Sequence, residues 1–193
     1  REDAKMRVKL PDKFMKEVKK YATKAQVIFP FGGEPFFFRP VVQMLEQHDA
    51  NLETRFHFIT NATLLTDRIY DTIERLPISS IGASLDAATE ESFMRLRVRG
   101  RNANWETVLA NLERLQGLKH RKHFSFTLSM TLNTLNSSEI ESFVDLALSF
   151  DAEPLIMLVA NPYNTTEFQK SYLNFTDAQF EEMDTKIGNS ITK

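Results

Sequence analysis

The chain has 193 residues, of which 42% are hydrophobic, a length and composition typical of one well-packed globular domain and not of a disordered chain. Its formal net charge of -2 and its pI near 6.1 give no reason to expect nucleic acid or an anionic membrane surface as the main partner. Because the sequence contains no cysteine, a disulfide framework and a thiolate metal site are both excluded within these residues.

The first ten residues are charged and mixed, without the basic tip and apolar run of a signal peptide, and no stretch approaches the length of a membrane span. We therefore expect a cytoplasmic protein whose partners do not include a membrane. A small, charged metabolite is compatible with this composition.

A helix over 11–24 and then a short apolar strand over 27–31 open the predicted fold, because apolar residues first recur at helical spacing and then form a continuous run. The strand ends in Gly32, Gly33 and Glu34. The glycines allow a sharp turn and a close approach of backbone to a ligand, and carboxyl ends of parallel strands are where ligands bind. The alternative is a plain turn with Glu34 as its solvated tip.

The same alternation of helix and strand continues to the end of the chain. Further strands are predicted over 54–60, 78–85, 123–132 and 154–160, and further helices over 40–48 and after the capping residues Thr66, Thr89, Asn104, Ser138 and Thr176. Ser138 with Glu141, and Thr176 with Gln179, form predicted capping boxes. Five strands separated by helices, with no hairpin signal, indicate right-handed βαβ units and a parallel sheet. The predicted fold class is α/β.

Mostly uncharged polar residues follow the predicted strands. They are Glu34, Asn61, Ser84, Asp86, Asn133 and Asn161. No lysine or histidine stands at a strand end, which weighs against an aldolase or isomerase of the usual barrel kind. His120 and His123 flank Arg121 and Lys122 and precede a strand, so positive charge disfavours a metal there.

A series of arginines suggests nucleic-acid binding at first sight. It comprises Arg95, Arg97, Arg99 and Arg101. Arginines near a helix C-terminus more often stabilise its carbonyl end, and the net charge of the chain favours that interpretation.

Several of these motifs together resemble the radical S-adenosylmethionine (radical SAM) enzymes. The resemblance is carried, in the order and spacing of that family, by Phe31-Gly32-Gly33-Glu34-Pro35, by Ile59-Thr60-Asn61 with Leu64-Leu65, by Ser84-Leu85-Asp86-Ala87-Ala88-Thr89 through Arg97, and by Leu132-Asn133-Thr134-Leu135-Asn136. It extends from about Pro11 to Asn161. It implies a partial TIM-like (β/α)6 barrel over residues 1–161, with the first strand missing, followed by a loop and an amphipathic helix in 162–193.

The resemblance also implies that S-adenosylmethionine binds across the top of this barrel and is cleaved reductively with a [4Fe-4S] cluster. Carbonyl groups of Gly32 and Gly33 and the carboxylate of Glu34 are the candidate acceptors for its ammonium group, and Ser84 and Arg97 are the candidate donors to its carboxylate. The remaining candidates are Asn133 for the ribose hydroxyls, and Leu158 and Val159 for packing against the adenine.

The sequence departs from the family at the cluster, which three cysteines hold in a C-x-x-x-C-x-x-C loop after the first barrel strand. Because this chain has no cysteine, we expect a fragment of a radical enzyme that modifies a peptide or a small molecule, with the cluster loop upstream of Arg1. The alternative is a non-catalytic binding module of the same fold for a nucleotide-like ligand or a protein partner. A missing first strand also predicts that the strand over 27–31 is an exposed edge, which residues 6–10 cover or through which the chain self-associates.

Overall fold

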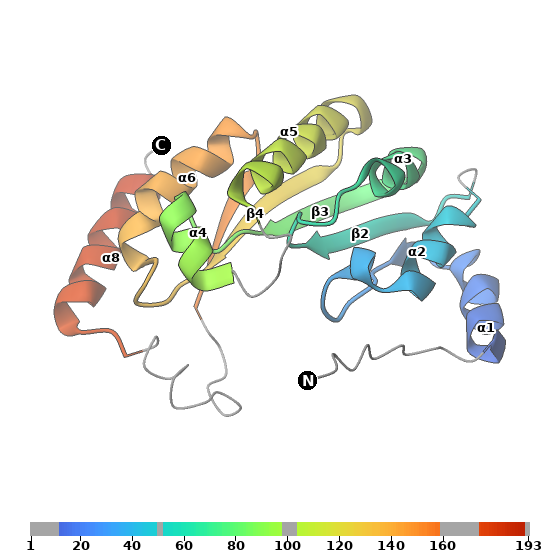
Figure 1. The fold of residues 1–193 in the computed structure, drawn as a ribbon, viewed down its shortest axis with the longest axis horizontal. Helices are drawn as coiled ribbons and strands as arrows, with labels where there is room; N and C mark the ends of the chain where they lie inside the picture. The colour runs from blue at the N-terminus through green and yellow to red at the C-terminus, as the bar shows by residue number, and fades with distance from the viewer. Residues whose placement is uncertain (1–11, 50–51, 98–103, 159–173, 192–193) are drawn as a thin grey trace. The chain divides into compact units, whose positions relative to one another are not determined.

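The computed structural model describes residues 12–49, 52–97, 104–158 and 174–191 (Figure 1). The chain forms two compact units. The first comprises Arg1–Phe58 and Leu64–Ser79, and the second comprises Ile59–Thr63 and Ser80–Lys193. The predicted boundary between residues 161 and 162, the predicted strand cover at residues 6–10, and Val159 all lie outside the described residues.

Helices and strands alternate along the chain as predicted. The elements up to residue 75 are α1 (Asp12–Ala22), β1 (Val27–Ile28), the 3-10 helix η1 (Pro35–Phe37), α2 (Arg39–Glu46), β2 (Arg55–Thr60) and α3 (Asp67–Arg75). The later elements are β3 (Ile78–Ser84), α4 (Glu90–Arg97), α5 (Trp105–Lys122), β4 (Ser125–Thr131), the 3-10 helix η2 (Ser137–Glu139), α6 (Ile140–Ser149), β5 (Glu153–Met157) and α8 (Asp177–Ile191).

One five-stranded sheet has the order β1-β2-β3-β4-β5, so each strand neighbours the next one along the chain. The sheet is parallel, as the pairings β1 with β2, β3 with β4, and β4 with β5 illustrate. An order without reversal is that of a barrel and not that of a doubly wound sheet, which changes direction at a switch point. The predicted α/β class and parallel sheet are confirmed, and the sheet is that of a partial (β/α) barrel.

The first unit is built on two fully buried phenylalanines of β2, Phe56 and Phe58. Their rings stack 5.8 Å apart, and Phe36 and His48 pack against them with centroid distances of 5.5 and 4.8 Å. The strand β1 is shorter than predicted, ending at Ile28, because Pro30 has no N–H for the ladder and the glycine turn follows. The helix α2 likewise begins one residue earlier and ends two residues earlier than predicted.

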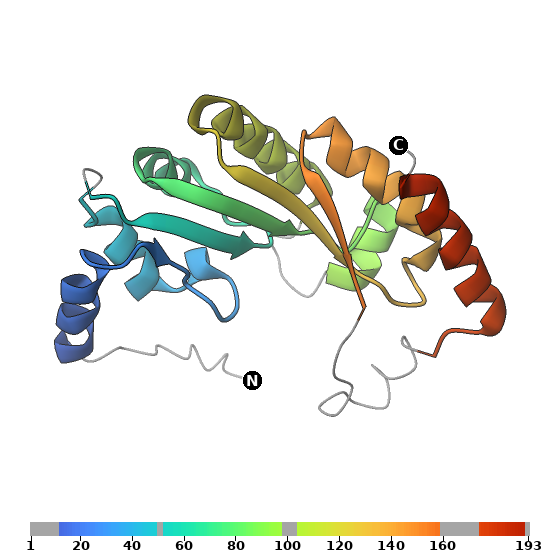
Figure 2. The ribbon, with the colours of Figure 1, turned by 180° about the vertical axis from the view of Figure 1, so that it is seen from behind.

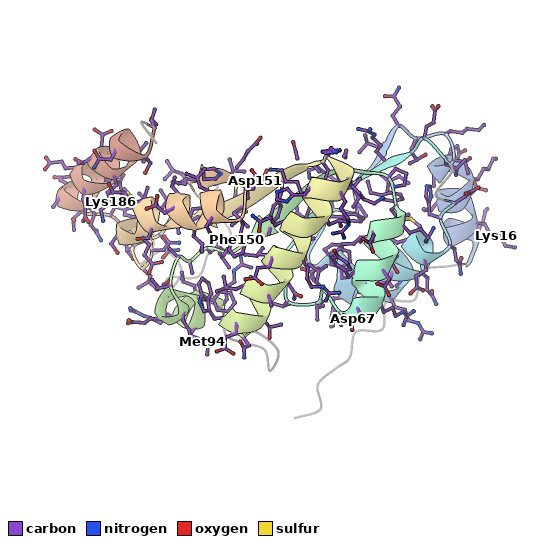
Figure 3. The ribbon with its side chains drawn as sticks, turned by 90° about the horizontal axis from the view of Figure 1, so that it is seen from above. Lys16, Asp67, Met94, Phe150, Asp151 and Lys186 are labelled. Atoms are coloured by element: carbon purple, nitrogen blue, oxygen red, sulfur yellow. The ribbon has the colours of Figure 1, made fainter. Side chains whose placement is uncertain are left out.

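In the second unit, α5 and α6 lie along one face of β4 (Figures 1 and 2). Alternate residues of β4 face these helices and are buried, including Phe126, Leu128 and Met130. Beside α6 lies α8, where Met183 is buried and Lys186 donates a hydrogen bond of 2.6 Å to the main-chain oxygen of Ser138 (Figure 3). None of the described helices combines the length and the hydropathy that a bilayer-spanning helix needs.

Most of the predicted helix starts are confirmed by their hydrogen bonds. Thr66, Asn104 and Thr176 accept from the backbone N–H groups of Ile69, Thr107 and Gln179 at 3.4, 3.2 and 3.3 Å. Thr89 accepts from the Ser92 N–H at 3.3 Å at the start of α4.

The predicted capping box of Ser138 and Glu141 is wrong. Instead, η2 precedes α6, and the N-cap residue of α6 is Glu139, which makes no side-chain capping bond there. Its carboxylate instead accepts hydrogen bonds at the start of α4. The fifth strand is also shorter than predicted, so Leu158 follows β5 and is not part of it.

Candidate functional site

The turn after β1 belongs to the first unit and has a backbone that only glycine adopts readily. Gly32 has φ of 109° and Gly33 has φ of 83°. A Cβ atom added to either residue meets no atom within 4 Å, so the turn needs these glycines for their backbone freedom and not for lack of space. Glu34 follows and accepts the Phe36 N–H at 3.3 Å, which makes it the N-cap of η1. The predicted glycine turn is therefore present, with Glu34 oriented by the helical turn that it caps.

The candidate residues after β3 belong to the second unit. Ser84 is the last residue of β3, and its register partner on β4 is Ser129. The two hydroxyl groups are 3.4 Å apart, with Ser129 donating to Ser84. Side chains of register partners in a parallel pair lie on the same face of the sheet, so small hydroxyl groups occupy this face at the carboxyl ends of both strands.

Arg97 lies in the last turn of α4, and the contact that holds its side chain is an ion pair with Asp86, two residues after the end of β3. Its Nη2 lies 2.5 Å from Oδ2 of Asp86. Both side chains are about three-quarters buried, with exposed fractions of 25% and 22%. The Nε atom of Arg97 is also buried and has no hydrogen-bond partner among the described residues. Since a buried N–H without an acceptor is costly, this group is suited to receive an anionic oxygen of a ligand.

Asn133 and Asn136 form the turn that follows β4. The side chain of Asn133 accepts the Leu135 N–H at 2.9 Å and donates to the Thr131 oxygen at 3.3 Å. Asn136 is fully buried and donates to the main-chain oxygens of Asp86 and Thr131 at 2.9 and 3.0 Å. Sequence reasoning missed Asn136 as a site residue, although the pair of asparagines three residues apart directly after a strand was a usable signal.

Glu139 fixes the start of α4 and was also missed. Its carboxylate accepts the Ala88 N–H at 2.8 Å and the hydroxyl groups of Thr89 and Ser92, each at 2.7 Å. A carboxylate at a helix N-terminus is favoured by the helix dipole and by the unpaired N–H groups there. Because Arg97 is at the other end of this short helix, Glu139 helps to determine where the guanidinium lies.

Exposed apolar side chains lie at the end of β5. Leu158 is 66% exposed, and Leu155 and Met157 are 46% and 38% exposed. By register, Leu155 pairs with Ser129 and Met157 with Thr131, so both lie on the sheet face of the hydroxyl groups. These two residues were not singled out from the sequence, although the alternation of β5 would have indicated them.

The histidines that suggested a metal make other contacts. Nε2 of His120 lies 3.1 Å from the carboxylate of Asp151, and Nζ of Lys119 lies 2.8 Å from it, where the chain leaves α6 (Figure 3). Hydrogen bonds from Lys119 and His120 hold the pKa of the Asp151 carboxyl below its usual range. His123 ends α5 in a left-handed conformation with φ of 55°. In the described part of the chain, no three His, Asp or Glu side chains are grouped as metal ligands.

The strand order defines an α/β protein with the sheet of a partial barrel, and polar residues follow several of its strands. The chain belongs to the radical SAM superfamily, whose family model matches residues 1–147. This match confirms the resemblance seen in the motifs. A search of the curated proteins found no match.

Solved structures similar to this chain include radical SAM proteins. SuiB from Streptococcus suis is 14% identical over 95% of this chain and 41% of that chain, with a TM-score of 0.64. Native anSMEcpe with bound AdoMet is 14% identical over 90% and 49%, with a TM-score of 0.63. TsrM from Kitasatospora setae, a radical S-adenosylmethionine methyltransferase with cobalamin and a [4Fe-4S] cluster bound, is 13% identical over 74% and 29%, with a TM-score of 0.59.

At these identities the similarity shows the fold alone. The chain spans less than half the length of each of these three proteins.

Proposed function

We propose that this chain is the S-adenosylmethionine-binding part of a radical SAM enzyme. In the complete protein, a 5′-deoxyadenosyl radical derived from S-adenosylmethionine modifies a peptide or a small molecule. The observation that carries the proposal is the largely buried ion pair of Arg97 and Asp86 after β3, in which Nε of Arg97 has no hydrogen-bond partner among the described residues, in a chain of this superfamily.

The carboxylate of S-adenosylmethionine is assigned to Arg97 and Ser84. Nε of Arg97 has an N–H group to donate, and a guanidinium binds carboxylates through parallel N–H groups. The Ser84 hydroxyl accepts from Ser129 and keeps its own proton for a ligand oxygen.

The ammonium group is assigned to the glycine turn. The main-chain carbonyls of Gly32 and Gly33 are hydrogen-bond acceptors, and they lie in a turn whose backbone no Cβ covers. The Glu34 carboxylate binds the Phe36 N–H through Oε1, and a carboxylate accepts several hydrogen bonds, so it can also face a cation.

The ribose and the adenine are assigned with the help of the turns after β4 and β5. Asn133 uses its amide within the turn, but its side-chain oxygen has a second lone pair for a ribose hydroxyl. Leu158 provides exposed apolar surface for the adenine. Val159 is proposed for the same role on the basis of the family resemblance alone.

The iron–sulfur cluster does not fit these residues, because thiolates hold such clusters and the chain has no cysteine. We propose that its ligands are residues outside this chain. The same observation favours the alternative function, a non-catalytic module that binds a nucleotide-like ligand or a protein partner. Iron and sulfide analysis of the anaerobically purified complete protein separates the two, since the enzyme contains both elements and the module neither.

The binding function can be tested by titrating this chain with S-adenosylmethionine and measuring the heat of binding by calorimetry and the amide shifts by NMR. We expect saturable binding with shifts at Ser84 and Asp86. Arg97→Ala should weaken binding by about 1.5–3 kcal/mol, the range for a hydrogen bond to a charged group. Arg95→Ala is the matched control, because Arg95 lies on the same helix and its closest ion pair, with Glu91, is 4.0 Å long and exposed. Unchanged affinity in Arg97→Ala would reassign Arg97 to stabilising α4 and the end of β3.

A further inference from the structure

Asp86 joins three parts of the site through three different oxygen atoms. Its Oδ2 accepts from Arg97 at 2.5 Å, and its Oδ1 accepts the backbone N–H of Thr131 at 2.8 Å. Its main-chain oxygen accepts from Asn136 at 2.9 Å. The carboxylate is therefore anchored to β4 independently of Arg97, and it presents a fixed acceptor to the guanidinium.

The backbone at Asp86 supports this arrangement. It has φ of 58°, in the left-handed region that Asp and Asn tolerate better than other residues with a side chain. The Asp86 N–H bonds to the Ser129 oxygen at 3.3 Å, so the main chain at this turn is tied to β4 as well. The carboxylate is aimed by the turn and not only by its partner.

Arg97 is thus held at two points. The start of its helix is fixed by Glu139, and the tip of its side chain is fixed by Asp86. A long side chain that is already ordered loses less conformational entropy when a ligand binds than a free one does.

We propose that Asp86 is a positioning residue that orients the Arg97 guanidinium for the carboxylate of S-adenosylmethionine. This inference rests on the proposed function. Asp86 takes one N–H group of Nη2, and the guanidinium keeps Nε for the ligand. The charge of Asp86 by itself opposes a second carboxylate nearby, so the proposal requires that orientation outweighs this repulsion.

The variant Asp86→Asn tests the proposal, because asparagine tolerates the same backbone but has one acceptor oxygen where the carboxylate has two. Thr131 and Arg97 then compete for that oxygen. We expect the affinity for S-adenosylmethionine to fall about tenfold, at the lower end of the effect of a charged hydrogen bond. The affinity for decarboxylated S-adenosylmethionine, which gives Arg97 nothing to bind, should change by no more than about twofold on the same scale.

The two ligands distinguish positioning from a merely structural role. An equal loss of affinity for both would show that Asp86 only holds the strand ends, and this would overturn the proposal. A rise or no change in affinity for S-adenosylmethionine would show that charge repulsion dominates, and this would overturn it as well. Arg95→Ala should change neither affinity.

Two further measurements keep the outcome clear. If the unaltered chain does not bind S-adenosylmethionine, the proposed function itself fails, whereas binding that Asp86→Asn leaves unchanged removes only the role of Asp86. If Asp86→Asn does not fold, as judged by amide exchange in the helix α5, Asp86→Glu replaces it. Glutamate keeps both oxygens but moves them by one methylene, so the same selective loss is expected and an unchanged affinity refutes the proposal.

Discussion

Arg75 offers the sharpest test of how the first unit is held together. It lies at the end of α3, and its guanidinium donates to three carbonyl oxygens at the end of α2. Nη1 lies 2.7 Å from the His48 oxygen, and Nη2 lies 2.9 and 3.0 Å from the oxygens of Leu45 and Glu46. The last carbonyls of a helix have no partner within the helix, and a positive charge is favoured there.

The magnitude follows from these contacts. Two of the hydrogen bonds are part-buried and the third is exposed. At about 1 kcal/mol for each part-buried bond, with a few tenths from the third bond and the helix dipole, Arg75→Ala should lower the free energy of unfolding by about 2–3 kcal/mol. Arg75→Lys keeps the charge but lacks the planar fork, so about half of this loss should remain.

The assay is hydrogen exchange of backbone amides, which reports each unit separately. Protection should fall in α2 and α3, while amides of α5 and α6 in the second unit serve as an internal reference. Arg68→Ala is the matched control, because Arg68 lies on the same helix and makes an exposed ion pair with Glu46 at 2.6 Å. A loss in Arg75→Ala no larger than in Arg68→Ala would refute the reasoning, because water would then satisfy the α2 carbonyls equally well.

Three further predictions concern pH, the glycine turn and the sheet edge. Burial and, to a smaller extent, the charge of Arg75 lower the pKa of His48 in the folded chain, so the unfolded chain binds a proton more readily. The free energy of unfolding should therefore fall as the pH drops below about 6.5. In His48→Phe, the urea midpoint should no longer depend on pH in this range. Gly33→Ala should lower stability by about 1–2 kcal/mol because of its positive φ, whereas Gly188→Ala, inside α8 and in open space, should raise it by about 0.5–1 kcal/mol in the same measurement. Because β1 ends the sheet order and Val27 is 51% exposed, we predict self-association through this edge, which light scattering should detect and Val27→Lys should abolish.

The controls for these predictions are internal. If the urea midpoint of His48→Phe still depends on pH, other titrating groups cause this dependence. If both glycine substitutions destabilise the chain, backbone conformation and chain entropy do not explain the effect of Gly33→Ala. A strictly monomeric chain at all concentrations would show that the edge at β1 is tolerated without a second copy.

Local signals were sufficient to predict the elements and most helix starts. The caps at Thr66, Asn104 and Thr176 depend on atoms three residues apart, so the sequence pattern contains the whole interaction. Strand ends were less predictable, because they depend on the neighbouring strand. The apolar run after Ile28 continues to Phe31, but pairing with β2 stops where the chain turns toward the glycines.

The error at Ser138 and Glu141 shows why the site was only partly predictable. The acidic residue that matters is Glu139, and its partners Ala88, Thr89 and Ser92 are 47 to 51 residues earlier in the chain. A capping pattern read locally cannot distinguish a carboxylate that caps its own helix from one that caps another. The same applies to Arg97, whose ion-pair partner Asp86 the sequence analysis did not predict.

Asn136, which the sequence did not reveal as a site residue, is polar, buried and paired with a residue far away in the chain. Asn136 is 0% exposed and has its partners at the ends of two strands, so it follows no apolar periodicity and matches no local cap. A buried amide remains stable only if its donors and acceptors are satisfied, and three of its hydrogen bonds run to Asn133, Asp86 and Thr131. Replacing Asn136 with an apolar residue would therefore remove its donor from the main-chain oxygen of Asp86 and leave the oxygen of Thr131 with the longer bond from Asn133. It follows that the geometry around Arg97 depends on buried side chains that the motif of Gly32, Gly33, Glu34, Ser84 and Arg97 does not contain.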